Sequence, residues 1–423
     1  MNAPTPPARS AARGFFPLDK ELELVSGDLT PRAQEGLVRL TTWVPFEPAC
    51  QLLQALTGVQ VSKASARRFS LQTGKVVCQE WEEQANRLQK ELKDPPEGAN
   101  QQVFSADGAM VPLVAGVWGE VKTLAIGVSV STQTEEAHVQ DLSYCSRLAD
   151  VPGFEKATLV EMHRRGVEKA VAVAAVMDGA DWLQGFIDYH REDAERILDF
   201  AHAAEYVSAI GEAVRGAGFH LPKTWLEGVL HRLKHEGPER VLLHLSRLCQ
   251  RCLTPDVLKK WYYLLHRHSQ MQYPLYQATG WPIGSGMVES ANKVVVEARL
   301  KGTGMHWKPE NVNPMLALRN AVCNDRWSET WQTSHQQKLQ LQKQRREQSA
   351  HTRRARVEAV ILALLLPLHL PQIHPEEQAL AAFPTPAPPA SPVPKGRTEA
   401  QKRWGRRPFS PKGFRLQAEF AKK

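Results

Sequence analysis

The first stretch with a clear periodicity of apolar residues is 47–75. Its leucines recur with helical spacing up to Gly58, a residue type that commonly ends a helix. After a short turn, Ser62 is a favourable N-cap for a second helix. These features are the outline of a helix-turn-helix, to which we assign residues 19–75, and residues 1–18 are expected to be disordered.

A charged helix follows and ends before two consecutive prolines, so residues 76–96 are interpreted as a linker helix. The pattern then changes to β-rich runs at 103–108, 110–118 and 122–130, separated by gaps of turn length. These runs predict an antiparallel meander.

Helices and strands alternate after the meander. The pattern predicts a helix over 154–169, a buried strand within 170–182, a helix over about 181–193 and a short strand at 196–200. Three antiparallel strands followed by this alternation are the order of a ribonuclease-H-like α/β domain. We therefore expect such a catalytic domain over 97–203 and 281–326, in a chain whose length suggests two to three domains.

Two further regions complete this organisation. Residues 204–280 are helical throughout, with 231–248 strongly amphipathic, and are interpreted as an all-helical insertion. Residues 327–423 form a basic C-terminal region that begins with a helix rich in Gln, Lys and Arg. This region is expected to be largely disordered, because residues 384–397 are proline-rich.

The charge balance favours a polyanionic partner. The chain has 53 Lys and Arg against 45 Asp and Glu, a formal net charge of +8. Much of the excess lies in the C-terminal fifth. Between Lys338 and Arg356 a single acid, Glu347, accompanies Lys338, Lys343, Arg345, Arg346, Arg353, Arg354 and Arg356. A basic run is often only a solvated face, but here it favours contact with DNA.

The cysteines and the apolar runs indicate the compartment. Six cysteines in a long chain that shows no leader fit a reducing cytoplasm, and a DNA partner adds association with the nucleoid. The longest apolar run, 359–366, is too short to cross a bilayer, so no membrane partner is expected. Cys249 and Cys252 have the spacing of zinc ligands but lack a second pair, and the segment fits an amphipathic helix better.

Three acids are candidates for chemistry. Asp107 and Asp178 each end a predicted buried strand in an Asp-Gly pair, and Glu289 follows a Gly-Ser-Gly turn at the start of a basic helix. Singly, an Asp-Gly pair is usually a turn, and Glu289 could simply match the helix dipole. Two such aspartates on strands expected to be neighbours are a stronger signal.

Phosphodiester chemistry gives a reason to gather these acids. Two divalent ions about 3.5–4 Å apart can activate a nucleophile and stabilise the leaving oxygen. Mg²⁺ prefers hard oxygen ligands, including carboxylates. The three acids are therefore predicted to bind two Mg²⁺ or Mn²⁺ ions.

The sequence around these acids resembles a known family. The stretches SADGAMVPL, VMDGADW, LDFAHAAEY and IGSGMVESANKVVVEARLKGTGMHW are similar to the DDE transposases of bacterial insertion sequences in the ISKra-type group, relatives of the Mutator-like transposases. The resemblance covers roughly residues 20–325. It implies that Asp107, Asp178 and Glu289 are the catalytic, metal-binding triad.

The same resemblance implies that Asp199 and His202 form a D-x-x-H pair beside the triad. The chain departs from the pattern of the group at Ala201, where an aromatic residue is usual, and at Tyr206, where a histidine is. His202 could instead be a helix-start histidine that Asp199 satisfies.

Candidate DNA-binding residues lie in two places. In the helix-turn-helix, Ser62, Lys63, Ser65 and Ala66 would face a major groove while Arg67 and Arg68 reach phosphates. Near Glu289, Lys293, Arg299 and Lys301 could hold phosphates. Trp307 could stack on a base at the element end, although a tryptophan there is more often a core anchor.

These features predict a DNA transposase that binds the ends of an insertion sequence, then cleaves and transfers strands into target DNA. Synapsis of two ends implies a homodimer or a larger assembly. A non-enzymatic DNA-binding regulator on the same scaffold, or a metal-dependent nuclease without strand transfer, are the alternatives.

Overall fold

The computed structural model describes residues 29–91, 94–132, 135–251 and 254–365. It is a mixed α/β structure around one five-stranded mixed sheet of order β3-β2-β1-β4-β5. β1 pairs antiparallel with β2 and parallel with β4, β2 pairs antiparallel with β3, and β4 pairs parallel with β5. The strands are β1 (Gln101–Pro112), β2 (Trp118–Thr132), β3 (Glu135–Leu148), β4 (Ala172–Met177) and β5 (Glu195–Leu198).

The meander has the expected number of strands, but the predicted boundaries are wrong. Residues 103–108 and 110–112 belong to one strand, β1, whereas Trp118 already begins β2, and the third strand is β3. Gly108 is therefore no turn residue; it lies within β1, where a Cβ would meet the side chain of Glu120. The chain turns instead at Ala115 and Gly116, both of which have positive φ.

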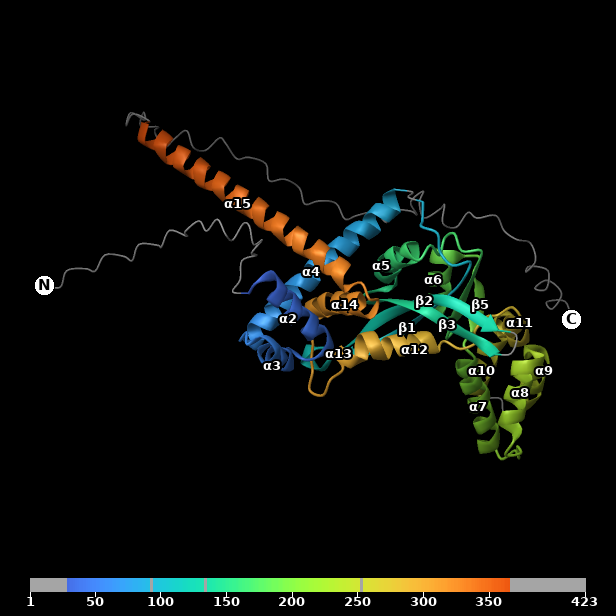
Figure 1. Cartoon of the computed structure of the whole chain (residues 1–423). Coiled ribbons are helices and arrows are strands. Elements are labelled where there is room, and N and C mark those ends of the chain that lie inside the picture. Colours follow the sequence, from blue (N-terminus) through green and yellow to red (C-terminus); the bar gives the residue numbers. More distant parts are fainter. Residues whose placement is uncertain (1–28, 92–93, 133–134, 252–253, 366–423) are drawn as a thin grey trace, which may run out of the picture.

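Each face of the sheet is covered by helices (Figure 1). One face packs against α5 (Val151–Arg164) and α6 (Asp181–Arg191), with Phe154 and Phe186 stacked at 5.3 Å between ring centroids. The opposite face packs against α12 (Gly286–Ala291), the π-helix Asn292–Glu297 and α13 (Ala298–Leu300). The sheet is thus the middle layer of three.

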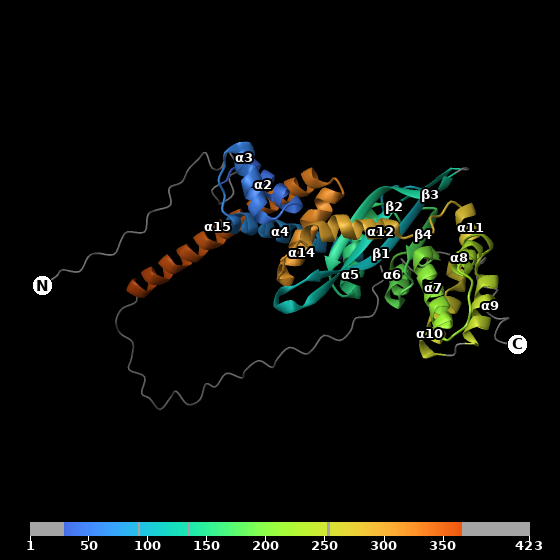
Figure 2. The ribbon, with the colours of Figure 1, turned by 90° about the horizontal axis from the view of Figure 1, so that it is seen from below.

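Residues 204–280 are predominantly helical, as expected, and their helices cluster on the β5 side of the sheet (Figures 1 and 2). Gly237, at φ 91°, divides the amphipathic stretch 231–248 into two helices. The helices are α7 (Phe200–Gly216), α8 (Trp225–Glu236), α9 (Pro238–Cys249), α10 (Pro255–His266) and α11 (Tyr273–Ala278), with a 3₁₀ turn at His268–Met271.

The N-terminal helices α2 (Pro31–Trp43), α3 (Phe46–Thr57) and α4 (Lys63–Lys90) lie at the other end of the molecule. Gly58 ends α3 in the left-handed conformation, and the Ser62 side chain caps α4 by accepting from the backbone N–H of Ser65. Both predicted caps are confirmed. The boundary expected at residue 75 is wrong, because α4 continues without a break to Lys90.

Helix α14 (Pro309–Cys323) protects the edge strand β3 through a row of asparagines. Each side-chain amide accepts from the N–H and donates to the C=O of one strand residue, over 2.8–3.3 Å. The pairs are Asn313 with Leu148, Asn320 with Ser146 and Asn324 with Tyr144. The amides thereby replace part of a sixth strand and satisfy backbone groups that an exposed edge would offer to another chain.

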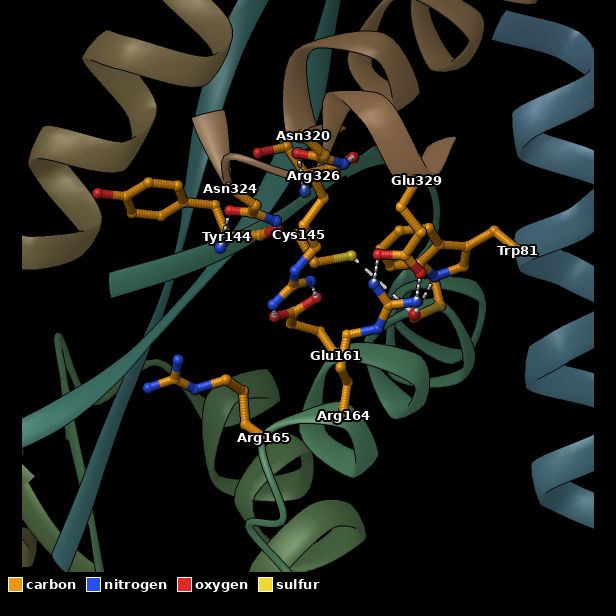
Figure 3. Close-up of polar contacts among 12 residues, drawn as sticks. Trp81, Tyr144, Cys145, Glu161, Arg164, Arg165, Asn320, Asn324, Arg326 and Glu329 are labelled. Atoms are coloured by element: carbon orange, nitrogen blue, oxygen red, sulfur yellow. Dashed lines mark hydrogen bonds and ion pairs between the residues drawn. The ribbon is translucent and has the colours of Figure 1, made fainter. Parts of the chain in front are cut away.

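The last described helix, α15 (Trp327–Leu365), projects away from the sheet (Figure 1). The helix expected at the start of the C-terminal region is confirmed, and it extends to Leu365. The disorder expected for the rest of that region concerns residues 366–423, which lie outside the described part, as do residues 1–28. At its base, Arg326 donates to both oxygens of the buried Glu161 at 2.6 and 2.9 Å. Arg164 bonds Glu329 in the same bidentate way (Figure 3). Within the described ranges, no helix is long and apolar enough to cross a membrane.

The contact between α4 and α14 yields a test of the fold. Gly74 lies where a Cβ would overlap the Pro314 carbonyl oxygen and come within 2.9 Å of the Pro314 Cα. Gly74→Ala should lower the free energy of unfolding by about 2 kcal/mol or more, because backbone must move to admit the methyl group. Urea unfolding measures the change.

Gly185→Ala is the matched control, since Gly185 is also inside a helix but has nothing within 4 Å of the added Cβ. It should stabilise the protein by about 0.5–1 kcal/mol through helix propensity. Equal effects of the two changes would contradict the close packing of α4 on α14.

Candidate active site

Asp107 and Asp178 stand level with each other on adjacent strands. The parallel register of β1 and β4 pairs Gln101 with Ala172 and Phe104 with Ala175. Continued by three residues, the same register sets Asp107 opposite Asp178, which directly follows the last residue of β4. One residue beyond the last backbone pair, the Ser105 hydroxyl still donates to the Val176 carbonyl at 2.6 Å, so the two strands remain adjacent there. The expectation that Asp107 ends its strand is wrong, but its position beside Asp178 needs only the register.

Glu289 approaches this point from the helix that crosses the sheet. It lies in the first turn of α12 and is exposed. One helical turn later, Asn292 Nδ2 donates to Asp107 Oδ2 at 2.9 Å and so ties the helix to β1. The helix therefore brings a third carboxylate to the two aspartates.

The three acids interact electrostatically. Burial raises the pKa of Asp107 above its ordinary value, and the negative charges of Asp178 and Glu289 raise it further. Hydrogen bonds from the Gly108 N–H and from Asn292 act in the opposite direction but do not cancel the rise. Asp107 therefore has both a burial cost and the repulsion of two nearby acids acting on its ionised form.

Asp107, Asp178 and Glu289 lie near one another but do not form a preformed metal-binding site. In the part of the chain that the structure describes, no three His, Cys, Asp or Glu side chains are grouped closely enough to hold one ion. The donor set is nevertheless chemically suited to Mg²⁺ or Mn²⁺, since it consists of carboxylate oxygens with a buried amide beside them. Carboxylates that repel one another are expected to stand apart until a cation compensates their charge.

Asp199 fixes the turn that precedes Glu289. Its Oδ1 caps α7 by accepting from the backbone N–H of His202 at 3.0 Å, and its Oδ2 accepts from the Ser285 N–H at 2.7 Å. The Ser285 hydroxyl donates to the same oxygen. Asp199 therefore joins the end of β5 to the start of α12. The His202 ring does not bond Asp199 in this arrangement but lies 3.6 Å from Glu205.

The helical insertion holds the loop that carries Asp178. Tyr263 of α10 donates from its hydroxyl to the Asp178 carbonyl, and Arg267 Nε donates to the Gly179 carbonyl at 2.8 Å. Arg267 also reaches Asp181 at 3.1 Å and stacks over the Tyr263 ring. Gly179 has φ 77°, and a Cβ there would lie 2.7 Å from both clamping side chains. Glycine is thus required here by conformation and by space.

Two predicted DNA-binding residues are buried and are corrected here. Arg299 is 2% exposed; its Nε donates to the Thr41 carbonyl, and its guanidinium lies over the Phe46 and Trp307 rings. Trp307 is 7% exposed and donates to the Leu300 carbonyl, so the core-anchor alternative describes it. Neither side chain can touch DNA in this conformation.

The remaining candidates differ in accessibility. Ala66 is buried and cannot face a groove, whereas Ser62, Lys63, Arg67 and Arg68 are exposed on α4. Lys293 and Lys301 are exposed too, and Lys301 is paired with Glu297 at 2.6 Å.

The lysine and arginine residues of α15 also differ in accessibility. Lys338 donates to Thr73 Oγ1 at 2.6 Å, and burial lowers its pKa to about 8. Lys343, Arg345, Arg346, Arg353, Arg354 and Arg356 are exposed.

The cysteine pair gives no support to a zinc site. Cys249 is buried at the end of α9, and Cys252 lies outside the described residues. His244 accepts a hydrogen bond from Trp225 Nε1 at 2.9 Å and is already engaged.

Sequence reasoning missed several residues at this site. Asn292 had a usable signal, because it lies three residues after Glu289 and so on the same helical face. Tyr263 and Arg267 had no such signal, since they bond the carbonyls of Asp178 and Gly179 across more than 80 residues of intervening chain. No protein-family model matches the chain, and no curated protein matches it significantly.

The repulsion at Asp107 leads to a pH prediction. The pKa of Asp107 is higher in the folded than in the unfolded chain, so its ionisation costs stability as the pH rises from the unfolded value through the folded one. Glu289→Gln removes one of the repelling charges. This variant should have a lower pKa at Asp107, seen by carboxyl carbon NMR, and a larger free energy of unfolding at pH 7 without divalent cations.

Glu227→Gln is the matched control, because Glu227 is also an exposed first-turn acid but belongs to α8. It should lose only the dipole contribution, a few tenths of a kcal/mol, and leave Asp107 unchanged. An unaltered Asp107 titration in Glu289→Gln would show that the two carboxylates do not interact.

Proposed function

We propose that this protein is a DNA transposase of the DDE type, which cleaves and transfers DNA strands with the help of divalent cations. The sheet order β3-β2-β1-β4-β5, with one antiparallel meander followed by two parallel strands, supports a ribonuclease-H-like catalytic core. In such a sheet the central strands carry acids at one place. The corresponding residues here would be Asp107 and Asp178, with Glu289 joining them from α12.

The observation that carries the proposal is the register of β1 and β4. It aligns two aspartates on neighbouring strands, and the bond from Asn292 to Asp107 brings the Glu289 helix to the same point. A purely structural sheet has no need to gather acids whose charges raise the pKa of a partly buried neighbour, as they do at Asp107. A site for divalent cations does.

Each residue then has a distinct role. Asp107, Asp178 and Glu289 would together hold the cations. Bound Mg²⁺ or Mn²⁺ supplies charge for activating a water or 3′-hydroxyl and for stabilising the leaving oxygen. Asp199 holds the turn before Glu289, and Tyr263 and Arg267 hold the loop of Asp178.

Exposed lysine and arginine side chains would contact the DNA backbone. Lys63, Arg67 and Arg68 lie along the first two turns of α4, and Lys293 lies one turn beyond Glu289. The six exposed lysine and arginine residues of α15 extend the positively charged surface along this projecting helix (Figure 1). Such residues bind phosphates without reading sequence, and their contribution weakens as salt increases.

A joining assay tests this function. Protein, labelled element ends and Mg²⁺ or Mn²⁺ are incubated, and we expect joined products from the wild type. Asp178→Asn and Glu289→Gln should bind the ends normally but give no cleaved or joined product, because each keeps its shape and loses a charge. Cleaved ends without joining would indicate a nuclease, and bound but uncut DNA a regulator; both outcomes contradict the proposal.

Arg67→Ala is the converse variant for the same assay. It should weaken binding to all sequences and flatten the dependence of log K on log salt by about one unit, as for one lost phosphate contact. Joined product should return at saturating protein, since the triad is intact. An unchanged salt slope would remove α4 from the proposed DNA surface.

A further inference from the structure

The buried side-chain amide of Asn292 uses its nitrogen in a hydrogen bond but not its oxygen. It is 6% exposed, and its Nδ2 donates to Asp107 Oδ2 at 2.9 Å. Its Oδ1 is buried without any hydrogen-bond partner. A buried acceptor left unpaired lowers the stability of the fold, and such a group in a native structure calls for a missing partner.

The position of this amide is fixed by the backbone. Asn292 begins the π-helix that follows α12, one turn beyond Glu289. π-helical turns inside α-helices are frequent at functional sites, because they reorient side chains at a local cost in hydrogen bonding. Arg319 compensates part of that cost by donating to the carbonyls of Val294 and Val295. The turn that aims Asn292 at Asp107 is therefore supported by a buried arginine.

We propose that Asn292 is a further ligand of the catalytic cation, which it binds through Oδ1, and that its amide donates to Asp107 only while the site is empty. The inference rests on the function proposed above. It adds a neutral oxygen to three carboxylates, and it gives the unpartnered Oδ1 a partner.

The chemistry suits both states of the site. Without a cation, an N–H donor on Asp107 offsets part of the repulsion from Asp178 and Glu289. With a cation, Asp107 no longer needs that donor, and an amide oxygen is a hard ligand of the kind that Mg²⁺ and Mn²⁺ accept. The Asn292 side chain would thus stabilise the ionised acids in the empty site and bind the cation in the occupied site.

Mn²⁺ binding to the full-length protein, followed by electron paramagnetic resonance, tests the ligand role without any catalytic readout. Asn292→Ala should weaken Mn²⁺ binding about tenfold or more, the scale found for lost groups around a metal. Asn292→Asp should bind at least as tightly as the wild type, because it keeps an oxygen at the site although it cannot donate to Asp107.

The aspartate variant separates a ligand from a mere donor. If Asn292 only restrains Asp107, Asn292→Asp should lose affinity as Asn292→Ala does, and that result would overturn the inference. Asn324→Ala is the matched control, since it also removes a partly buried amide, at the β3 edge, and should leave Mn²⁺ affinity unchanged. Circular dichroism confirms that each variant is folded.

Two further variants separate this inference from the proposed function. If Asp178→Asn and Glu289→Gln lose Mn²⁺ but Asn292→Ala binds it normally, the triad stands and the role of Asn292 is refuted. If none of the three changes affects Mn²⁺, the metal site itself is refuted and the proposed function fails with it.

Discussion

Two carboxylates held level on neighbouring strands are the constraint around which this molecule is arranged. The pairing of β1 with β4 sets Asp107 beside Asp178, and the resulting repulsion adds to burial in raising the pKa of Asp107. The surrounding groups counteract this cost. Asn292 donates to Asp107, and Tyr263 and Arg267 hold the backbone that carries Asp178. The insertion is therefore part of the site, not an appendage to the sheet.

The helix of Glu289 also connects the two ends of the molecule. Beyond the π-helix, Arg299 donates to the Thr41 carbonyl, and Arg319 donates to the Thr42 carbonyl, both in the last turn of α2. Positive groups are favourable at this end of a helix. Buried arginines therefore connect the N-terminal helices, including α4 with its exposed lysine and arginine residues, to the helical segment that carries Glu289.

Much of the fold could be predicted from local patterns. Gly58 and Ser62 mark helix ends through chemistry that depends only on neighbouring residues, and the apolar run of β4 indicates a buried strand. Gly108 misled the prediction, because an Asp-Gly pair looks the same in a turn and within a strand beside Glu120. The burial of Arg299 and Trp307 had no local signal, since it depends on α2 and α3 packing against a segment some 250 residues later. The three acids could be picked out from the sequence. The contacts of Tyr263 and Arg267 with the Asp178 loop could not, because they depend on tertiary structure alone.

The central claim is that Asp107, Asp178 and Glu289 together bind the cations that act on DNA. The most direct measurement is anomalous scattering from crystals of the protein grown with Mn²⁺ and a duplex carrying an element end. The account predicts two manganese peaks about 3.5–4 Å apart, held by Asp107, Asp178 and Glu289. Manganese bound elsewhere, or no peak at these acids at saturating Mn²⁺ with DNA in place, would contradict it.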